Sequence, residues 1–216
     1  MSQWRVNKNM KCLIISGGEY CEAFEELNYD YIIACDKGIE YACKMGIIPH
    51  LIMGDFDSFK GQIPSAYSSI PIERFIPHKD DTDTMLAIKK ALELGYKDIT
   101  LTCALGGRLD HTYANLQSLA FIAANGGAGR LYSDRERILT FTGGKLILPR
   151  LEGFSLSLFA FSNTCDGLSV QGTEYEVTNI SLSNTFPLGI SNEWKADRAV
   201  ITMEKGLLLV IESRMD

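Results

Sequence analysis

The sequence lacks the features that would place the protein in a membrane or on nucleic acid. Its 216 residues contain no apolar run long enough to cross a bilayer, and the polar stretch 1–11 has no hydrophobic region of the kind that a signal peptide needs. No run of Lys and Arg forms a basic patch, and the net charge of −6 argues against nucleic-acid binding. We therefore expect a soluble, cytoplasmic protein with no membrane partner and no nucleic-acid partner.

Cysteine patterns for binding metals are also missing. The six cysteines form no C-x-x-C pair, and none has a histidine at the spacing of metal ligands. Cys12, Cys35 and Cys103 lie in apolar runs, where we expect them to be small core residues in a reduced protein.

Two common nucleotide-binding motifs are absent. The chain has neither G-x-x-x-x-G-K-[ST] nor G-x-G-x-x-G, and the pair Gly17-Gly18 is too short to replace either one. A bound phosphate would therefore be held by a divalent cation, by basic side chains such as Lys79 and Arg108, and by the amides of turns.

The first two-thirds of the chain alternates apolar runs with helical patterns. Strands are predicted at 12–16, 31–35, 51–53 and 99–105, and helices at 82–94 and 111–124. Because the runs are apolar on both faces, they are typical of strands buried on both sides of a parallel sheet. We predict an α/β fold whose N-terminal domain, residues 1–132, holds a doubly wound, mostly parallel sheet.

The pattern changes after about Leu131. Short β-like runs follow at 138–141, 145–148, 155–159, 168–170, 199–203 and 207–211, with glycines between them. Strands at this spacing indicate a small all-β sandwich or barrel, which we assign to residues 133–216.

Acidic residues follow the third predicted strand. In Gly54-Asp55-Phe56-Asp57-Ser58 the two carboxylates alternate on an extended chain, so both point to one side. Ligands of open parallel sheets bind at the carboxyl ends of strands. Paired carboxylates suit Mg²⁺, a hard cation that can bind carboxylate and phosphate oxygens at the same time. An ordinary Asp-rich turn is an equally good interpretation of this motif alone.

A second acidic cluster opens the helix at 82–94. Thr82 or Asp81 is suited to cap that helix, but capping does not explain three acids beside Lys79. Like charges so close together are costly unless a cation or substrate compensates them, and Lys79 is placed to meet a phosphate oxygen. The acids concerned are Asp80, Asp81 and Asp83.

A third cluster, Gly106-Gly107-Arg108-Leu109-Asp110-His111, ends one strand and opens a helix. Arg108 offers a bidentate grip on phosphate, whereas a tight turn with Asp110 as helix cap is the simpler interpretation. Asp36 ends the second strand and adds one more acid. Four strand ends thus converge on one sheet edge, which favours a Mg²⁺-phosphate site over four unrelated turns.

The β region carries a polar cluster at 181–185 and 189–194. Ser and Asn are common in loops, which is the simpler explanation, but Trp194 beside two Ser-Asn pairs suggests stacking on a flat heterocycle.

These motifs, in this order, resemble thiamine pyrophosphokinase of the bacterial type. The matching stretches are IIACDKGIEYA around Asp36, GDFDS at 54–58, KDDTD at 79–83, GGRLDH at 106–111, and SNTF followed by SNEW at 183–194. The resemblance implies transfer of pyrophosphate from ATP to the thiamine hydroxyl, which gives thiamine diphosphate and AMP. It also implies a requirement for Mg²⁺ and a homodimer with the active site at the subunit interface.

The resemblance also implies roles for individual residues. The catalytic residues would be Asp55, Asp57, Asp80 and Asp83, with Asp55, Asp57 and Asp83 on the metal. ATP would be bound by Asp36, Lys79, Thr82, Arg108, Asp110, His111 and Asn115. Thiamine would be bound by Ser183, Asn184, Ser191, Asn192 and Trp194. Two alternatives stay open: a pyrophosphokinase that acts on a pterin alcohol, and a non-catalytic sensor of nucleotide or thiamine.

Overall fold

The computed structural model describes residues 10–22, 28–56, 65–75 and 81–215. The chain falls into two compact units, Met1–Asp134 and Arg135–Asp216. Within these described ranges, no helix has both the length and the apolar character that crossing a membrane requires.

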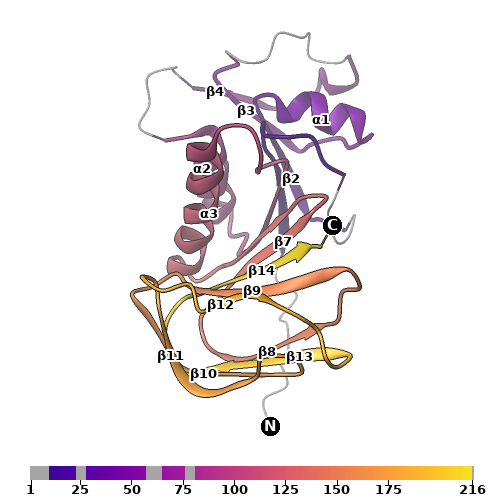
Figure 1. Ribbon diagram of the computed structural model, residues 1–216. Coiled ribbons are helices and arrows are strands. Elements are labelled where there is room, and N and C mark those ends of the chain that lie inside the picture. The colour runs from indigo at the N-terminus through magenta and orange to yellow at the C-terminus, as the bar shows by residue number, and fades with distance from the viewer. Residues whose placement is uncertain (1–9, 23–27, 57–64, 76–80, 216) are drawn as a thin grey trace. The chain divides into compact units, whose positions relative to one another are not determined.

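The first unit alternates strands and helices. Its elements are β1 (Lys11–Ile15), β2 (Tyr31–Cys35), α1 (Gly38–Lys44), β3 (Leu51–Gly54), the 3₁₀ turn η1 (Ser65–Tyr67), β4 (Ile72–Arg74), α2 (Asp83–Glu93), β5 (Asp98–Thr102), α3 (Leu109–Ala124) and β6 (Ala128–Tyr132). The strands hydrogen-bond in the order β6-β5-β1-β2-β3-β4, and each pair is parallel. Figure 1 shows α1 on one face of this sheet and α2 and α3 on the other, which confirms the predicted doubly wound arrangement.

Burial on both faces explains the apolar strands. Every residue of β3 and β5 is buried, as is β1 beyond its first residue. On the face covered by α1, Leu13 and Ile15 of β1 pack with Ile39 and Tyr41. Parallel strands covered by helices have no solvated face, so they need no polar alternation.

The start of α2 follows the sequence signals. The Thr82 side chain accepts a 3.2 Å hydrogen bond from the amide of Met85, which confirms the predicted cap. Beyond the helix, Gly95 takes a positive φ of 90°, a conformation that favours glycine at a helix end.

Three elements of the first unit escape the sequence patterns. Helix α1 has only seven residues, and β4 has only three, so neither gives a clear period. In β6, Gly129 looks like a turn residue, but a Cβ there would lie 3.1 Å from Leu119 and 3.2 Å from Ile122 of α3. The strand predicted at 99–105 ends early, at Thr102, because Cys103 adopts a positive φ of 53°.

The second unit is a β-sandwich, one of the two predicted forms. Its strands are β7 (Glu136–Phe141), β8 (Gly144–Pro149), β9 (Phe154–Ala160), β10 (Thr164–Gln171), β11 (Val177–Ser183), β12 (Gly189–Asn192), β13 (Arg198–Met203) and β14 (Leu208–Arg214). They pair antiparallel in the orders β12-β9-β14-β7 and β11-β10-β13-β8. One apolar core holds side chains from both groups, such as Leu158, Val210, Leu168 and Ile201.

The polar cluster that was expected in loops belongs largely to strands. Ser181 and Ser183 lie in β11, and Ser191 and Asn192 lie in β12. Alternation in β11 is broken at Asn179, whose φ is 52°, and the pairing with β10 shifts register nearby. This bulge separates Val177 from Ile180 by three positions, so the strand lacks the period of two that would reveal it.

Candidate functional site

A cavity of about 500 Å³ opens at the carboxyl ends of the parallel strands of the first unit. It is formed by the turns that follow β1, β2 and β5, and by the first turns of α2 and α3. Its lining residues are Ser16, Gly17, Gly18, Glu19, Cys35, Asp36, Lys37, Thr82, Asp83, Thr84, Ala104, Gly106, Gly107, Arg108, His111 and Asn115. Three of the four strand-end segments that were predicted to converge therefore meet around one cavity.

The backbone at this edge is held in uncommon conformations. Asp36 after β2, Phe56 after β3 and Cys103 after β5 have φ values of 50°, 63° and 53°. Non-glycine residues rarely adopt positive φ, and such strain persists where the surroundings fix it, often at functional sites. The strained residues therefore lie at the carboxyl edge of the sheet, where the acidic residues also lie.

The turn after β1 must contain glycine. Gly18 and Glu19 donate backbone hydrogen bonds of 2.7 and 2.8 Å to the carbonyls of Cys103 and Leu105. A Cβ on Gly18 would lie 2.6 Å from the Leu105 oxygen, so a side chain there would collide with backbone. The Gly17-Gly18 pair after the first strand was visible in the sequence. It was too short to be recognised as part of a ligand site.

Acidic residues of three segments line the cavity, namely Glu19, Asp36 and Asp83. Asp55 follows β3, the strand paired with β2. The Asp36 amide donates a 2.9 Å hydrogen bond to the carbonyl of Met53, which ties the two strand ends together. Carboxylate oxygens are the ligand atoms that Mg²⁺ prefers, so these residues have the chemical type that the ion needs.

The described residues hold only part of the acidic cluster. Asp57, Lys79 and Asp80 lie outside the described residues. Within the ranges that are described, no three acidic, His or Cys side chains gather into a group that could hold a metal. Asp81 forms a 2.6 Å ion pair with Lys89, so a side chain already compensates its charge.

Arg108 and Asp110 are paired with each other. The Arg108 guanidinium donates through Nε at 3.1 Å and through Nη2 at 2.5 Å to the two Asp110 carboxylate oxygens, and this hydrogen bonding lowers the pKa of Asp110. Both side chains are mostly exposed, at 74% and 62%. Helix α3 begins at Leu109 with Arg108 in the cap position, so the simpler interpretation of Asp110 as the cap is wrong.

The remaining predicted nucleotide residues lie along α3 and α2. Asn115 is buried and donates a 2.7 Å hydrogen bond from Nδ2 to the carbonyl of Ala104, which fixes the chain after β5. His111 is exposed on the cavity wall, and Thr82 lines it while capping α2.

Sequence reasoning missed four lining residues with hydroxyl or charged side chains, namely Ser16, Glu19, Lys37 and Thr84. Ser16 and Thr84 are buried hydroxyls joined by a 3.0 Å hydrogen bond. Glu19 reaches over Gly106, where a Cβ would meet its carboxyl carbon at 2.2 Å. Each of these residues stands next to a predicted motif or to the Gly-Gly pair, which is the signal that was available.

The second unit has its own cavity, of about 220 Å³. Its walls are mainly apolar and come from β9, β10, β11 and β12, with Tyr175 and Asn192 as the residues that carry polar side chains. Of the five residues predicted to bind thiamine, Asn192 alone belongs to this described lining.

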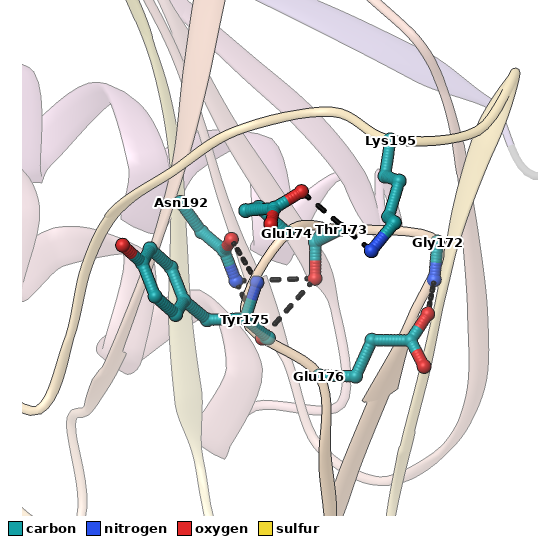
Figure 2. Close-up of polar contacts among 7 residues, drawn as sticks. All are labelled: Gly172, Thr173, Glu174, Tyr175, Glu176, Asn192 and Lys195. Atoms are coloured by element: carbon teal, nitrogen blue, oxygen red, sulfur yellow. Dashed lines mark hydrogen bonds and ion pairs between the residues drawn. The ribbon is translucent and has the colours of Figure 1, made fainter.

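Asn192 fixes the turn between β10 and β11 (Figure 2). Its Oδ1 accepts a 3.0 Å hydrogen bond from the amide of Tyr175, and its Nδ2 donates to Thr173 Oγ1 at 3.1 Å and to the Tyr175 carbonyl at 2.8 Å. The ends of the same turn are held by Glu176, which accepts from the Gly172 amide at 2.8 Å, and by an ion pair between Glu174 and Lys195. The carboxamide therefore holds the backbone of Tyr175 in place.

The other predicted thiamine residues have varied surroundings. Ser183 and Thr185 share a 2.8 Å hydroxyl contact, and the Asn184 side chain is exposed. Ser191 has a φ of 54°, and its amide donates to Ser157 Oγ at 2.9 Å. Trp194 is partly buried against the sandwich core, and its Nε1 has no hydrogen-bond partner within the described part of the chain.

Comparisons with known proteins agree across both units. Residues 25–126 match the family model for the thiamin pyrophosphokinase catalytic domain, and residues 145–208 match that for its vitamin B1 binding domain. Thiamine pyrophosphokinase of Bacillus subtilis is 31% identical over 186 residues, which are 84% of this chain and 86% of that one. Thiamin pyrophosphokinase 1 of Caenorhabditis elegans is 24% identical over 182 residues, covering 76% of this chain and 70% of that one.

Solved structures give the same result. The crystal structure of the Bacillus subtilis thiamine pyrophosphokinase matches with a TM-score of 0.86 at 28% identity, covering 95% of this chain and 99% of that one. A thiamin pyrophosphokinase family protein from Enterococcus faecalis matches with a TM-score of 0.82 at 26% identity, covering 95% and 100%. The chain belongs to the thiamine pyrophosphokinase family.

Proposed function

We propose that this chain transfers pyrophosphate from ATP to the hydroxyl of thiamine and releases AMP. The observation that carries the proposal is the cavity at the carboxyl edge of the parallel sheet, which Asp36, Asp83 and Arg108 line. The family to which the chain belongs supports the same activity. Residues 1–132 would bind the nucleotide, and residues 133–216 would bind thiamine.

The metal in this proposal is Mg²⁺, held by Asp55 and Asp83 together with Asp57. Its support is the ligand chemistry, because carboxylate oxygens suit a hard cation that also binds phosphate. The bound ion would neutralise charge on the phosphate oxygens during transfer.

The reaction proposed is a direct in-line displacement. The thiamine hydroxyl oxygen bonds to the β-phosphorus, the bond from that phosphorus to the α–β bridging oxygen breaks, and AMP leaves. A carboxylate accepts the hydroxyl proton, for which Asp57 and Asp80 are the candidates. Arg108, once it leaves Asp110 for a phosphate, would add a bidentate contact, and His111, Thr82 and Asn115 would shape the nucleotide side.

Thiamine would bind through the β unit, with Ser183, Asn184, Ser191, Asn192 and Trp194 as proposed contacts. The apolar cavity that Asn192 lines offers space for a flat ring beside Tyr175. Direct stacking on Trp194 has less support, since this side chain packs partly against the core.

We further propose a cytoplasmic homodimer with its active site at the subunit interface. Three large apolar side chains around the second cavity, Tyr175, Leu188 and Ile190, are 73%, 56% and 59% exposed, and clustered exposed apolar side chains favour an interface. All six cysteines are free, which suits a reducing compartment.

Product analysis tests the function. The purified protein is incubated with Mg²⁺-ATP and thiamine, and nucleotides and thiamine esters are separated by chromatography. Equal amounts of AMP and thiamine diphosphate are expected, and both should disappear when EDTA removes the metal. A hydroxymethyl pterin in place of thiamine is the matched acceptor control. Release of AMP with the pterin but not with thiamine would overturn the proposal, as would tight binding of both substrates without turnover.

A further inference from the structure

We propose that Lys37 binds a phosphate oxygen of the nucleotide in the cavity of the first unit, and that Tyr41 positions its ammonium group. The inference rests on the proposed function, because it takes a nucleotide polyphosphate as the ligand. Lys37 was not among the residues that the sequence motifs single out for a role.

The backbone that carries Lys37 is fixed. Asp36 before it has a φ of 50°, and Gly38 after it packs so closely on β1 that a Cβ would lie 2.1 Å from the Ile15 carbonyl oxygen. The side chain therefore starts from a defined point on the cavity wall, opposite the Gly17 turn. A Cβ on Gly17 would lie only 3.3 Å from the Cβ of Lys37, so the two segments are in close contact.

Tyr41 links Lys37 to the glycine turn. Its ring is buried, and its hydroxyl donates a 2.8 Å hydrogen bond to the carbonyl of Gly18. The Lys37 ammonium lies 5.3 Å from the centre of the same ring. The neighbouring Tyr41 side chain raises the pKa of Lys37, so the ammonium group keeps its charge. One phenol thus holds both the turn and the cation.

Charge in the cavity gives this cation its importance. The charged side chains of the described lining are Glu19, Asp36, Asp83, Lys37 and Arg108. Arg108 is already engaged by both oxygens of Asp110. Lys37 forms no ion pair within the described ranges, so its charge is available to a ligand without breaking an existing bridge. A lysine on a flexible stem meets phosphate as a mobile point charge.

Calorimetric titration with ATP and with adenosine, each with Mg²⁺ present, tests the inference. Adenosine has the same base and ribose but no phosphate. The Lys37→Met variant should bind ATP on the order of ten- to a hundredfold more weakly, while its affinity for adenosine is unchanged. Lys37→Arg should recover part of the loss, and Tyr41→Phe should show a smaller loss for ATP alone.

Lys44→Met is the matched control, since it removes the same charge from the last residue of α1, the helix that Lys37 precedes. Lys44 lies over the Tyr20 ring at 3.7 Å and is not part of the described cavity lining, so its ATP affinity should stay at the wild-type value. Unchanged ATP affinity in Lys37→Met overturns the inference. Equal losses for ATP and adenosine, or an equal effect of Lys44→Met, overturn it as well. Binding is measured without thiamine, so a wild type that fails to release AMP would refute the function separately.

Discussion

Thr84 Oγ1 donates a 3.0 Å hydrogen bond to Ser16 Oγ, joining the first turn of α2 to the end of β1. Both hydroxyls are buried and both line the cavity. Because Asp83 immediately precedes Thr84, this bond helps to fix where the acid stands relative to the sheet.

A double-mutant cycle should detect that coupling. Thr84→Val keeps the shape of the side chain and leaves the Ser16 hydroxyl without its partner, while Ser16→Ala removes the acceptor. We expect each single change to lower the free energy of unfolding by about 0.5–1.5 kcal/mol and the pair to be clearly non-additive. Urea unfolding provides the measurement, and strictly additive losses would mean that the two hydroxyls do not interact.

The ion pair of Arg108 and Asp110 should appear in the titration of the carboxyl group. Its pKa is lowered from the ordinary value of 3.8, so the pairing is present above that value and is lost as the pH falls through the lowered pKa. NMR detection of the side-chain carboxyl carbon should follow this transition below pH 3.8. Arg108→Gln should raise the pKa of Asp110 toward its ordinary value, whereas Lys89→Gln, which releases Asp81 instead, should leave it unchanged.

Thiol reactivity should distinguish one cysteine from five. Cys43 is exposed, and Cys12, Cys21, Cys35, Cys103 and Cys165 are buried. Burial raises the pKa of the Cys12 thiol to about 12, which disfavours the reactive thiolate. Ellman's reagent should therefore modify one thiol rapidly in the native protein and six in denaturant. The Cys43→Ser variant should lose the rapid phase, and a rapid phase of two or more thiols would contradict the burial of the others.

Asn192 should matter for stability more than the neighbouring Asn184. Replacing Asn192 with Ala removes three hydrogen bonds to the 173–175 turn, so the free energy of unfolding should fall by about 1–3 kcal/mol. The Asn184 side chain is exposed, so Asn184→Ala should change it by about 0.5 kcal/mol or less. Thermal or urea unfolding of both variants gives the comparison. Equal losses would show that the Asn192 carboxamide does not fix the turn.

Much of the α/β unit could be predicted because its strands are apolar on both faces and its helices carry clear end signals, as Thr82 and Gly95 illustrate. Elements were missed where local chemistry hides the period. Gly129 in β6 leaves room for the methyl groups of α3 that pack against it. The bulge at Asn179 disrupts the alternation of β11. Neither cause is visible from residues adjacent in sequence.

The site, too, has residues that could be predicted from the sequence and residues that could not. Acids after apolar strands reveal the carboxyl edge, since that position follows from the topology of a parallel sheet. Ser16 and Lys37 could not be found so, because a serine at the end of a strand and a lysine after an aspartate have many ordinary explanations. Ser16 gains its significance from Thr84, its hydrogen-bond partner 68 residues away. Lys37 gains its significance from close packing against the turn at Gly17.

The carboxylates at the carboxyl edge of the sheet are proposed to support pyrophosphate transfer to thiamine. The most direct test of this role is the initial rate of AMP release from Mg²⁺-ATP with thiamine, in the wild type, in Asp83→Asn and in Asp81→Asn. Asp83 lines the cavity, whereas Asp81 pairs with Lys89. We predict that the rate falls on the order of a hundredfold or more in Asp83→Asn, with the fold retained, and stays close to wild type in Asp81→Asn. A wild type that releases no thiamine-dependent AMP, or an Asp83→Asn variant of near-normal rate, would contradict this role of the carboxylates.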